Sequence, residues 1–258
     1  MVWSDTAFGA GKVARLTAEA VRYAILLNRL DVPANLMSQA VYDFNRLPFA
    51  SLPQSLWWYA GSAALADNVQ RDLAAGGCHL DARYQRRLDV ESRWIYWETH
   101  SGEAQNKRLR HKVYVSPSIR ALRETLAVVA RLCEAMGVVS FKLGLDAHGI
   151  LRSDKMVVYF TDPESRQMFV REALSCTEGL DAHGVPLTRG AGASGLLSTA
   201  EDPLMGALSW RQLISAELVD ILKTERDRGR GASVEVAIET VGAELVRRGL
   251  MPALTAAA

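Results

Sequence analysis

The sequence predicts an α+β fold, with a helical N-terminal part followed by a mixed or antiparallel sheet that has helices packed on one face. Three observations predict it. The 258 residues are 49% hydrophobic, which is enough to bury a sizeable core. Residues 11–30, 34–45 and 53–75 carry apolar side chains at mostly helical spacing. From about residue 91 onward, short runs with strand-like alternation are interleaved with helical runs.

This change of pattern divides the chain into two regions. Residues 1–90 are predicted as a mainly helical N-terminal region and residues 91–258 as an α+β domain, and one continuous domain is the alternative. The expected strands are 91–97, 110–116, 138–144 and 155–160, and the expected helices are 118–136, 162–175, 209–226 and 233–250.

Local signals mark where these elements begin and end. Gly137 is a stop signal for the helix at 118–136, and Cys133 lies on its apolar side. Thr161 and Glu164 have the spacing of a capping box for the next helix. The Gly-, Ser- and Pro-rich residues 177–209 predict a long loop, and such loops are usually functional or disordered.

Composition excludes several function classes. A net charge of +1 argues against nucleic acid or an anionic membrane as partner. No apolar run approaches the roughly 18 residues of a membrane helix, and the first residues lack the apolar core of a signal peptide. Three widely spaced cysteines do not indicate a disulfide framework, and the five histidines lack metal-ligand spacing. We therefore expect a soluble protein of the cytoplasm.

Strand alternation gathers polar residues on one side of three strands. Facing the same way are Lys112, Tyr114 and Ser116 in the first, Ser140 and Lys142 in the second, and Lys155, Val157 and Tyr159 in the third. These faces hold three of the six lysines and no Asp or Glu. A solvated outer face is the ordinary interpretation of such a pattern. A cationic surface with aromatic hydroxyls also suits an anion, and phosphate is the natural candidate.

A lysine on such a surface has a second possible role. If it is partly desolvated beside other cations, its pKa falls and it can act as a general base. Arg189 in the long loop and Arg211 just beyond it are further candidates for binding phosphate. Two other motifs favour plain structure. FGAGKVARL lacks the Ser or Thr and the preceding strand of a phosphate-binding loop, and the repeated DAHG reads as two tight turns.

A family resemblance covers roughly residues 90–225. The chain resembles the HopA-type effector domain in its successive motifs, which are HKVYVSP, SFKLG, LRSDKMVVYF and GVPLTRG followed by SWR. That domain occurs in bacterial type III effectors, in the lyase component of class V (split) lanthipeptide synthetases and in thioamitide gene clusters. It is distantly similar to the bacterial phosphothreonine lyases.

The resemblance implies roles for individual residues. Lys142 matches the general base of the lyases, and Lys112 matches the lysine of their preceding strand. Arg152 matches a phosphate ligand, and Tyr159 the tyrosine of the closing strand. Tyr114 stands where the lyases carry a histidine acid, so the identity of the general acid is left open. Lys155, which the lyase pattern does not clearly match, is a phosphate neighbour or a surface residue.

The implied reaction is β-elimination of phosphate from phosphoserine or phosphothreonine in a ribosomally made precursor peptide, giving dehydroalanine or dehydrobutyrine. It requires no metal or organic cofactor. Since the chain has no kinase motifs, a separate kinase is expected as partner, in a complex that hands over the phosphopeptide. The alternative is a non-catalytic effector or peptide-binding protein. The precursor peptide, its dehydrated positions, the leader-binding surface and the oligomeric state do not follow from the sequence.

Overall fold

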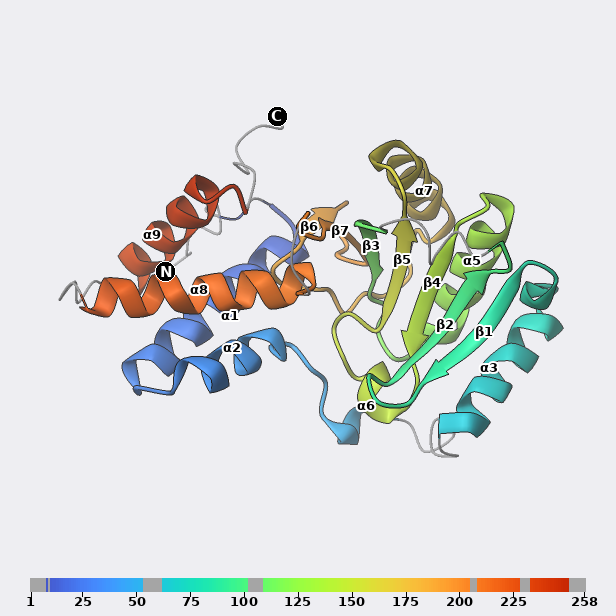
Figure 1. Ribbon diagram of the computed structural model, residues 1–258, viewed down its shortest axis with the longest axis horizontal. Helices are drawn as coiled ribbons and strands as arrows, with labels where there is room; N and C mark the ends of the chain where they lie inside the picture. The colour runs from blue at the N-terminus through green and yellow to red at the C-terminus, as the bar shows by residue number, and fades with distance from the viewer. Residues whose placement is uncertain are drawn as a thin grey trace.

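Seven strands form one antiparallel sheet in the computed structural model, which describes residues 8, 10–52, 62–101, 109–204, 208–227 and 233–250 (Figure 1). The strands are β1 (Tyr84–Asp89), β2 (Trp94–Thr99), β3 (His111–Val115), β4 (Ser140–Gly144), β5 (Met156–Phe160), β6 (Arg189–Ala191) and β7 (Leu197–Glu201). Their spatial order is β1-β2-β4-β5-β3-β7-β6. The predicted α+β class, with N-terminal helices and an antiparallel sheet, is confirmed.

The helices fall into two groups. They are α1 (Lys12–Arg29), α2 (Ala34–Tyr42), α3 (Ser62–Ala75), α5 (Leu122–Ala135), α6 (Ala147–Ile150), α7 (Pro163–Cys176), α8 (Trp210–Asp227) and α9 (Val234–Arg247). In Figure 1, α5 and α7 lie behind the sheet and α3 beside its β1 edge, whereas α1, α2, α8 and α9 form a separate helical lobe. That lobe draws on both ends of the chain. The predicted boundary after residue 90 falls between β1 and β2, which pair with each other.

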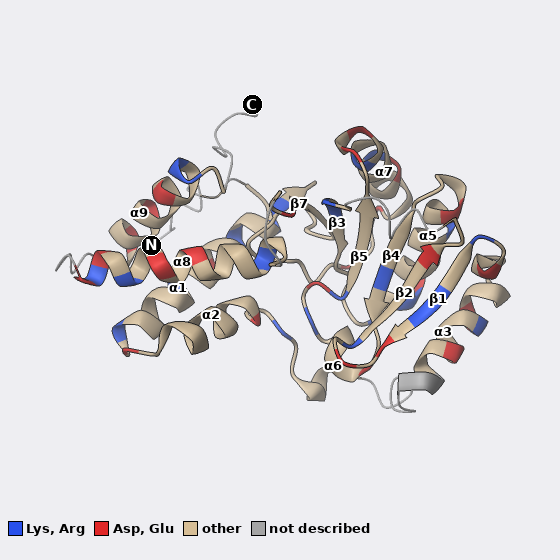
Figure 2. Cartoon of the chain, in the orientation of Figure 1, with Lys and Arg blue, Asp and Glu red and all other residues tan. Residues whose placement is uncertain are grey.

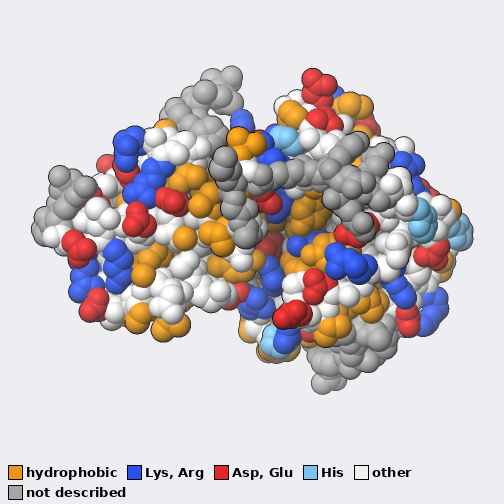
Figure 3. All heavy atoms as spheres, in the orientation of Figure 1, with side chains coloured by type: hydrophobic (Ala, Val, Ile, Leu, Met, Phe, Trp, Pro, Cys, Tyr) orange, Lys and Arg blue, Asp and Glu red, His pale blue; other side chains and the backbone are white. Residues whose placement is uncertain are grey.

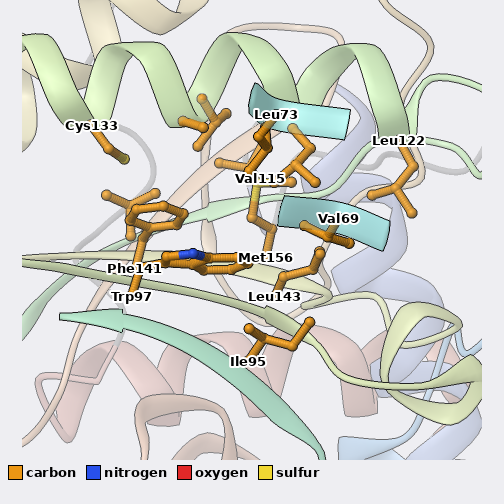
Figure 4. Packing of buried hydrophobic residues seen from close by; sticks show 14 of the residues in the cluster. Val69, Leu73, Ile95, Trp97, Val115, Leu122, Cys133, Phe141, Leu143 and Met156 are labelled. Atoms are coloured by element: carbon orange, nitrogen blue, oxygen red, sulfur yellow. The ribbon is translucent and has the colours of Figure 1, made fainter. Parts of the chain in front are cut away.

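The core fills the space between the sheet and the helices behind it. Trp97 of β2 stacks on Phe141 of β4, with ring centroids 4.9 Å apart and an interplanar angle of 10°. Figure 4 shows this pair beneath α5, which contributes Leu122 and Cys133. Because these side chains alternate with those on the other face, their burial fixes which residues point away from the core. A second apolar cluster holds the helical lobe together.

The segment between β4 and β5 depends on two glycines. A Cβ atom on Gly144 would collide with the backbone of Gly149, and one on Gly149 would collide with Gly144. The chain can therefore fold back tightly here through α6, where Asp146 accepts a hydrogen bond from the Gly149 N–H at 2.8 Å. The first DAHG, predicted as a tight turn, is the capped start of the short helix α6. The tight return also places residues 152–154 at the end of the sheet.

Some predicted elements differ from those observed. β1 lies in a segment that the sequence marks only as a break in the helical pattern, and β6 and β7 lie within the predicted loop 177–209. These strands are short or rich in polar residues, so their extended conformation depends on pairing with neighbouring strands and not on their own sequence. The capping-box prediction is wrong. Asp162, not Thr161, caps α7 by accepting from the Ser165 N–H at 2.7 Å.

One prediction falls partly outside the described residues, namely the start of the helix at 53–75. Of the helices within the described segments, none combines the length and the apolar character needed to cross a bilayer.

Candidate active site

The sheet face opposite the core carries a group of polar and aromatic side chains. The register sets Lys142 beside Tyr96 of β2 and Val157 of β5, and Lys112 beside Tyr159 of β5. Figure 2 shows basic residues on β1, β3 and β4. Figure 3 shows a groove between the helical lobe and the sheet, in which basic, acidic and apolar side chains meet. Strand alternation therefore builds one polar face, as the sequence predicts.

Lys142 lies among aromatic rings. Its Nζ atom is 3.9 Å from the centroid of the Trp94 ring, 5.4 Å from that of Tyr96 and 5.6 Å from that of Tyr159. Within the described residues it has no hydrogen-bond partner. Burial, then repulsion from Lys112, lower the pKa of Lys142 to about 7, although Asp154 opposes this. An amine with this pKa is substantially neutral near pH 7, so it can accept a proton.

Lys112 is held by a carboxylate. It is 5% exposed and forms an ion pair with Asp202. The other oxygen of Asp202 accepts a hydrogen bond from the Trp210 N–H at 2.8 Å, at the start of α8. The Lys112 amine also lies 5.3 Å from the centroid of the Tyr159 ring. Asp202 thus connects the sheet face to the helical lobe and fixes the position of one cation.

Two arginines share a second carboxylate. The Nε atom of Arg152 donates to Asp154 at 2.8 Å, and Nη1 of Arg211 lies 3.0 Å from the other Asp154 oxygen. Tyr42 completes the cluster, since its hydroxyl accepts from Arg152 and its carbonyl oxygen accepts from Arg211 at 2.6 Å. Arg152 also lies 4.7 Å from the Trp94 ring centroid. Trp94 therefore contacts both Arg152 and Lys142.

Two tyrosines on this face keep their protons. Burial, then the nearby Asp154 and Asp202, raise the pKa of Tyr114 well above its ordinary value. Burial, then Tyr96, likewise raise the pKa of Tyr159. Both hydroxyls therefore stay protonated at neutral pH and are potential donors to an anion. The carboxylates that hold the cations make both tyrosines weaker acids, so each can donate a hydrogen bond but gives up its proton reluctantly.

Six of the eight residues proposed from the sequence come together on this face or at its end. They are Lys112, Tyr114, Lys142, Arg152, Tyr159 and Arg211. Strand alternation alone indicated a surface without carboxylates, and this is wrong. Asp154 and Asp202 reach the surface from the segments that follow α6 and β7. The cations are thus partly neutralised before any ligand binds.

The other two residues lie elsewhere, which corrects their assignment as phosphate ligands. Lys155 is 0% exposed, and its amine bonds to the Pro117 carbonyl oxygen at 3.1 Å and to His183 Nδ1 at 2.8 Å. Lys155 immediately precedes β5, and Pro117 and His183 enclose its side chain. Arg189 pairs with Thr199 and is exposed on β6, two strands beyond Lys112. Neither side chain reaches the group around Lys142.

Sequence reasoning missed four members of the site, namely Tyr42, Trp94, Asp154 and Asp202. A signal existed for two of them. Asp154 follows Arg152 by two residues, and Asp202 lies between GVPLTRG and SWR of the family pattern. Tyr42 comes from α2, far away along the chain, and only the fold brings it to Arg152.

No protein family model matches the chain, and no curated protein sequence matches it. Among solved structures, the effector protein from Pseudomonas syringae pv. syringae strain 61 is similar, with a TM-score of 0.59 at 15% identity, covering 93% of this chain and 97% of that one. The effector protein from Pseudomonas syringae pv. tomato strain DC3000 has a TM-score of 0.50 at 12% identity, covering 87% and 91%.

A weaker likeness concerns the type III effector/phosphothreonine lyase OspF from Shigella flexneri, with a TM-score of 0.42 at 8% identity, covering 64% of this chain and 91% of that one. The chain is thus similar in fold to two Pseudomonas syringae effector proteins over nearly its whole length. The resemblance found in the sequence is confirmed at the level of the fold.

Proposed function

We propose that this protein is a lyase that removes phosphate by β-elimination from phosphoserine or phosphothreonine in a peptide. The observation that carries the proposal is Lys142, whose pKa is lowered to about 7 on a sheet face that also holds Lys112 and Arg152. A basic amine beside fixed cations is what proton removal next to a phosphate ester requires.

The reaction uses these groups in one sequence. The neutral Lys142 amine takes the proton from Cα of the phosphorylated residue. The electron pair of that C–H bond forms the Cα–Cβ double bond as the Cβ–O bond breaks, and phosphate leaves with the electrons of that bond. The product is dehydroalanine from phosphoserine or dehydrobutyrine from phosphothreonine. No oxidant or reductant is needed.

The leaving phosphate meets the cations. Lys112, Arg152, Arg211 and protonated Lys142 carry four positive charges against the two carboxylates of Asp154 and Asp202. The surplus is positive, so the face attracts a dianion. Asp154 and Asp202 hold the cations in position beforehand, which lowers the cost of organising the site. Tyr114 supplies a protonated hydroxyl for the departing oxygen.

The proposed biological setting rests on the family resemblance. The HopA-type motifs favour a ribosomal precursor peptide of a lanthipeptide or thioamitide cluster as substrate, in the cytoplasm of a bacterium. A separate kinase would supply the phosphopeptide, and a complex of the two proteins would hand it over. Chemistry requires such a supplier, because the elimination needs a phosphate ester as its leaving group.

A direct test uses the purified protein and a synthetic phosphothreonine peptide. We expect release of inorganic phosphate and a product lighter than the substrate by phosphoric acid, with an alkene that adds a thiol. Mass spectrometry and phosphate release measure the two outcomes. A product lighter only by the phosphoryl group, with the hydroxyl restored, would indicate hydrolysis and contradict elimination.

The pH dependence gives a further prediction. Since the base must be neutral, kcat/KM should rise with pH and level off above a midpoint near the Lys142 pKa of about 7. Lys112→Met removes a neighbouring positive charge and should move the midpoint to higher pH. The substrate phosphate titrates near pH 6, so its titration is measured separately. A midpoint that does not respond to Lys112→Met would argue against Lys142 as the titrating base.

The second candidate is a non-catalytic peptide-binding protein. Its support is that Lys112, Arg152 and Arg211 already have carboxylate partners. A binding protein with this face would hold a phosphopeptide and leave it intact. Tight binding of the phosphothreonine peptide with no phosphate release at any pH would favour this candidate over the lyase.

A further inference from the structure

A second cavity opens beside the polar face. It has a volume of about 490 Å³ and lies at the end of β7, between the sheet and the helical lobe. Arg110, Arg166 and Arg189 line it together with the apolar side chains of Trp210, Leu213 and Leu250. The groups thus come from several distant segments, and the cavity combines a cationic side with an apolar side.

The cavity has an excess of positive charge. Glu201 pairs with Arg110 at 2.8 Å, and that carboxylate also faces His111 at 3.4 Å. Within the described part of the chain, Arg166 and Arg189 have no carboxylate partner. Burial lowers the pKa of Arg166, Glu201 raises it and Arg189 lowers it, and the net shift is downward. Two arginines that repel each other across a cavity are stabilised when an anion enters it.

The cavity shares a wall with the proposed active site. Asp202 and Ala200 line it, and Asp202 is the carboxylate that holds Lys112. Three inter-strand steps, from β4 through β5 and β3 to β7, separate the strand of Lys142 from the strand that lines the cavity. At about 4.8 Å a step that is ~14 Å, which an extended peptide crosses in about four or five residues.

We propose that this cavity is a docking subsite for an acidic residue of the substrate peptide, with an apolar neighbour against Trp210. The acidic side chain lies about four or five residues from the phosphorylated Ser or Thr. The location of that phosphorylated residue rests on the proposed function. The occupant is a peptide carboxylate because the cavity offers arginines for an anion and apolar walls for the residue beside it.

Fluorescent phosphothreonine peptides test this directly by anisotropy, with Lys142→Ala protein so that no substrate is consumed. One series carries Glu-Leu four or five residues before or after the phosphothreonine, and the matched series carries Gln-Leu. We expect one Glu position to bind about tenfold tighter than its Gln partner, which corresponds to one charge-assisted hydrogen bond. The preference should persist with unphosphorylated threonine.

Variants then assign the preference to the cavity. Arg189→Gln and Arg166→Gln should remove it, and Arg189→Glu should favour a Lys-Leu peptide. Arg171→Gln, an exposed arginine of α7 that does not line the cavity, should leave it unchanged. Equal binding of all Glu and Gln peptides, or a preference that survives both cavity variants, overturns the subsite. If the preference holds while wild-type protein releases no phosphate, the subsite stands and the lyase assignment fails.

Discussion

Lys142→Ala is expected to abolish measurable phosphate release from a phosphothreonine peptide while the peptide still binds. Removal of a general base typically costs about 10²- to 10⁴-fold in rate. The neutral amine contributes little to binding the phosphate, because its pKa of about 7 leaves much of it uncharged at neutral pH. The loss should therefore appear in kcat and much less in KM.

Two control variants test whether the loss of activity is specific to the amine of Lys142. Lys223→Ala removes a lysine of α8 that pairs with Asp31, away from the sheet, and should retain full activity. Lys142→Arg keeps a cation of similar length but not a neutral base, so it should be as inactive as the alanine variant. Circular dichroism and thermal melting would check that each variant is folded. Phosphate release at the wild-type rate by Lys142→Ala would contradict the assignment of the base.

Strand alternation was the strongest guide to the site. It predicts that Lys112 and Lys142 share a face, because a buried Val113 and a buried Phe141 leave no other choice. It could not predict what meets that face from outside the strands. Asp154 and Asp202 lie in connecting segments, where tertiary contacts and not the two-residue alternation of a strand set the direction of a side chain.

For Lys155, strand alternation predicted a position on the polar face that the structure does not show. Alternation placed it with Val157 and Tyr159, but β5 begins one residue later, at Met156. Outside the strand, its side chain is enclosed by Pro117 and His183, and burial lowers its pKa to about 7 as well. A lowered lysine pKa alone therefore does not identify a catalytic base. The aromatic and cationic surroundings of Lys142 distinguish it.

The helical lobe shows a further limit of sequence reasoning. Its helices were predicted from their apolar spacing, but their association was not, because α1 and α2 pack with α8 and α9 from the other end of the chain. This association brings Tyr42 of α2 and Arg211 of α8 together at Asp154. The site therefore exists only when both ends of the chain are folded against the sheet.

Asp154→Asn tests this dependence and is expected to destabilise the fold strongly. The substitution removes the negative charge that holds Arg152 and the 2% exposed Arg211. Breaking a buried ion pair by removing one partner typically costs about 3–5 kcal/mol, because the remaining charge is left uncompensated. Urea denaturation measures the change. Asp43→Asn, which breaks the more exposed Arg46–Asp43 pair, should cost about 0–1 kcal/mol.

The pH dependence of this loss follows from the same carboxylate. Burial alone would raise the pKa of Asp154, but Arg211 and Arg152 lower it well below its ordinary value. A carboxyl whose folded pKa is lowered adds stability above its unfolded pKa of about 4, and that stability is lost as pH falls. The difference between wild type and Asp154→Asn should therefore be largest at neutral pH and shrink below about pH 4. A difference that stays constant would show that Asp154 acts through shape and not charge.

The same variant connects stability to catalysis. Asp154 is one of the carboxylates that raise the pKa of Lys142, in opposition to burial and Lys112. In Asp154→Asn protein that remains folded, the midpoint of kcat/KM should therefore move to lower pH, opposite to the shift expected for Lys112→Met. Opposite shifts are expected of a titrating amine that feels both charges, as Lys142 does. A midpoint that moves the same way in both variants would place the titrating base somewhere other than Lys142.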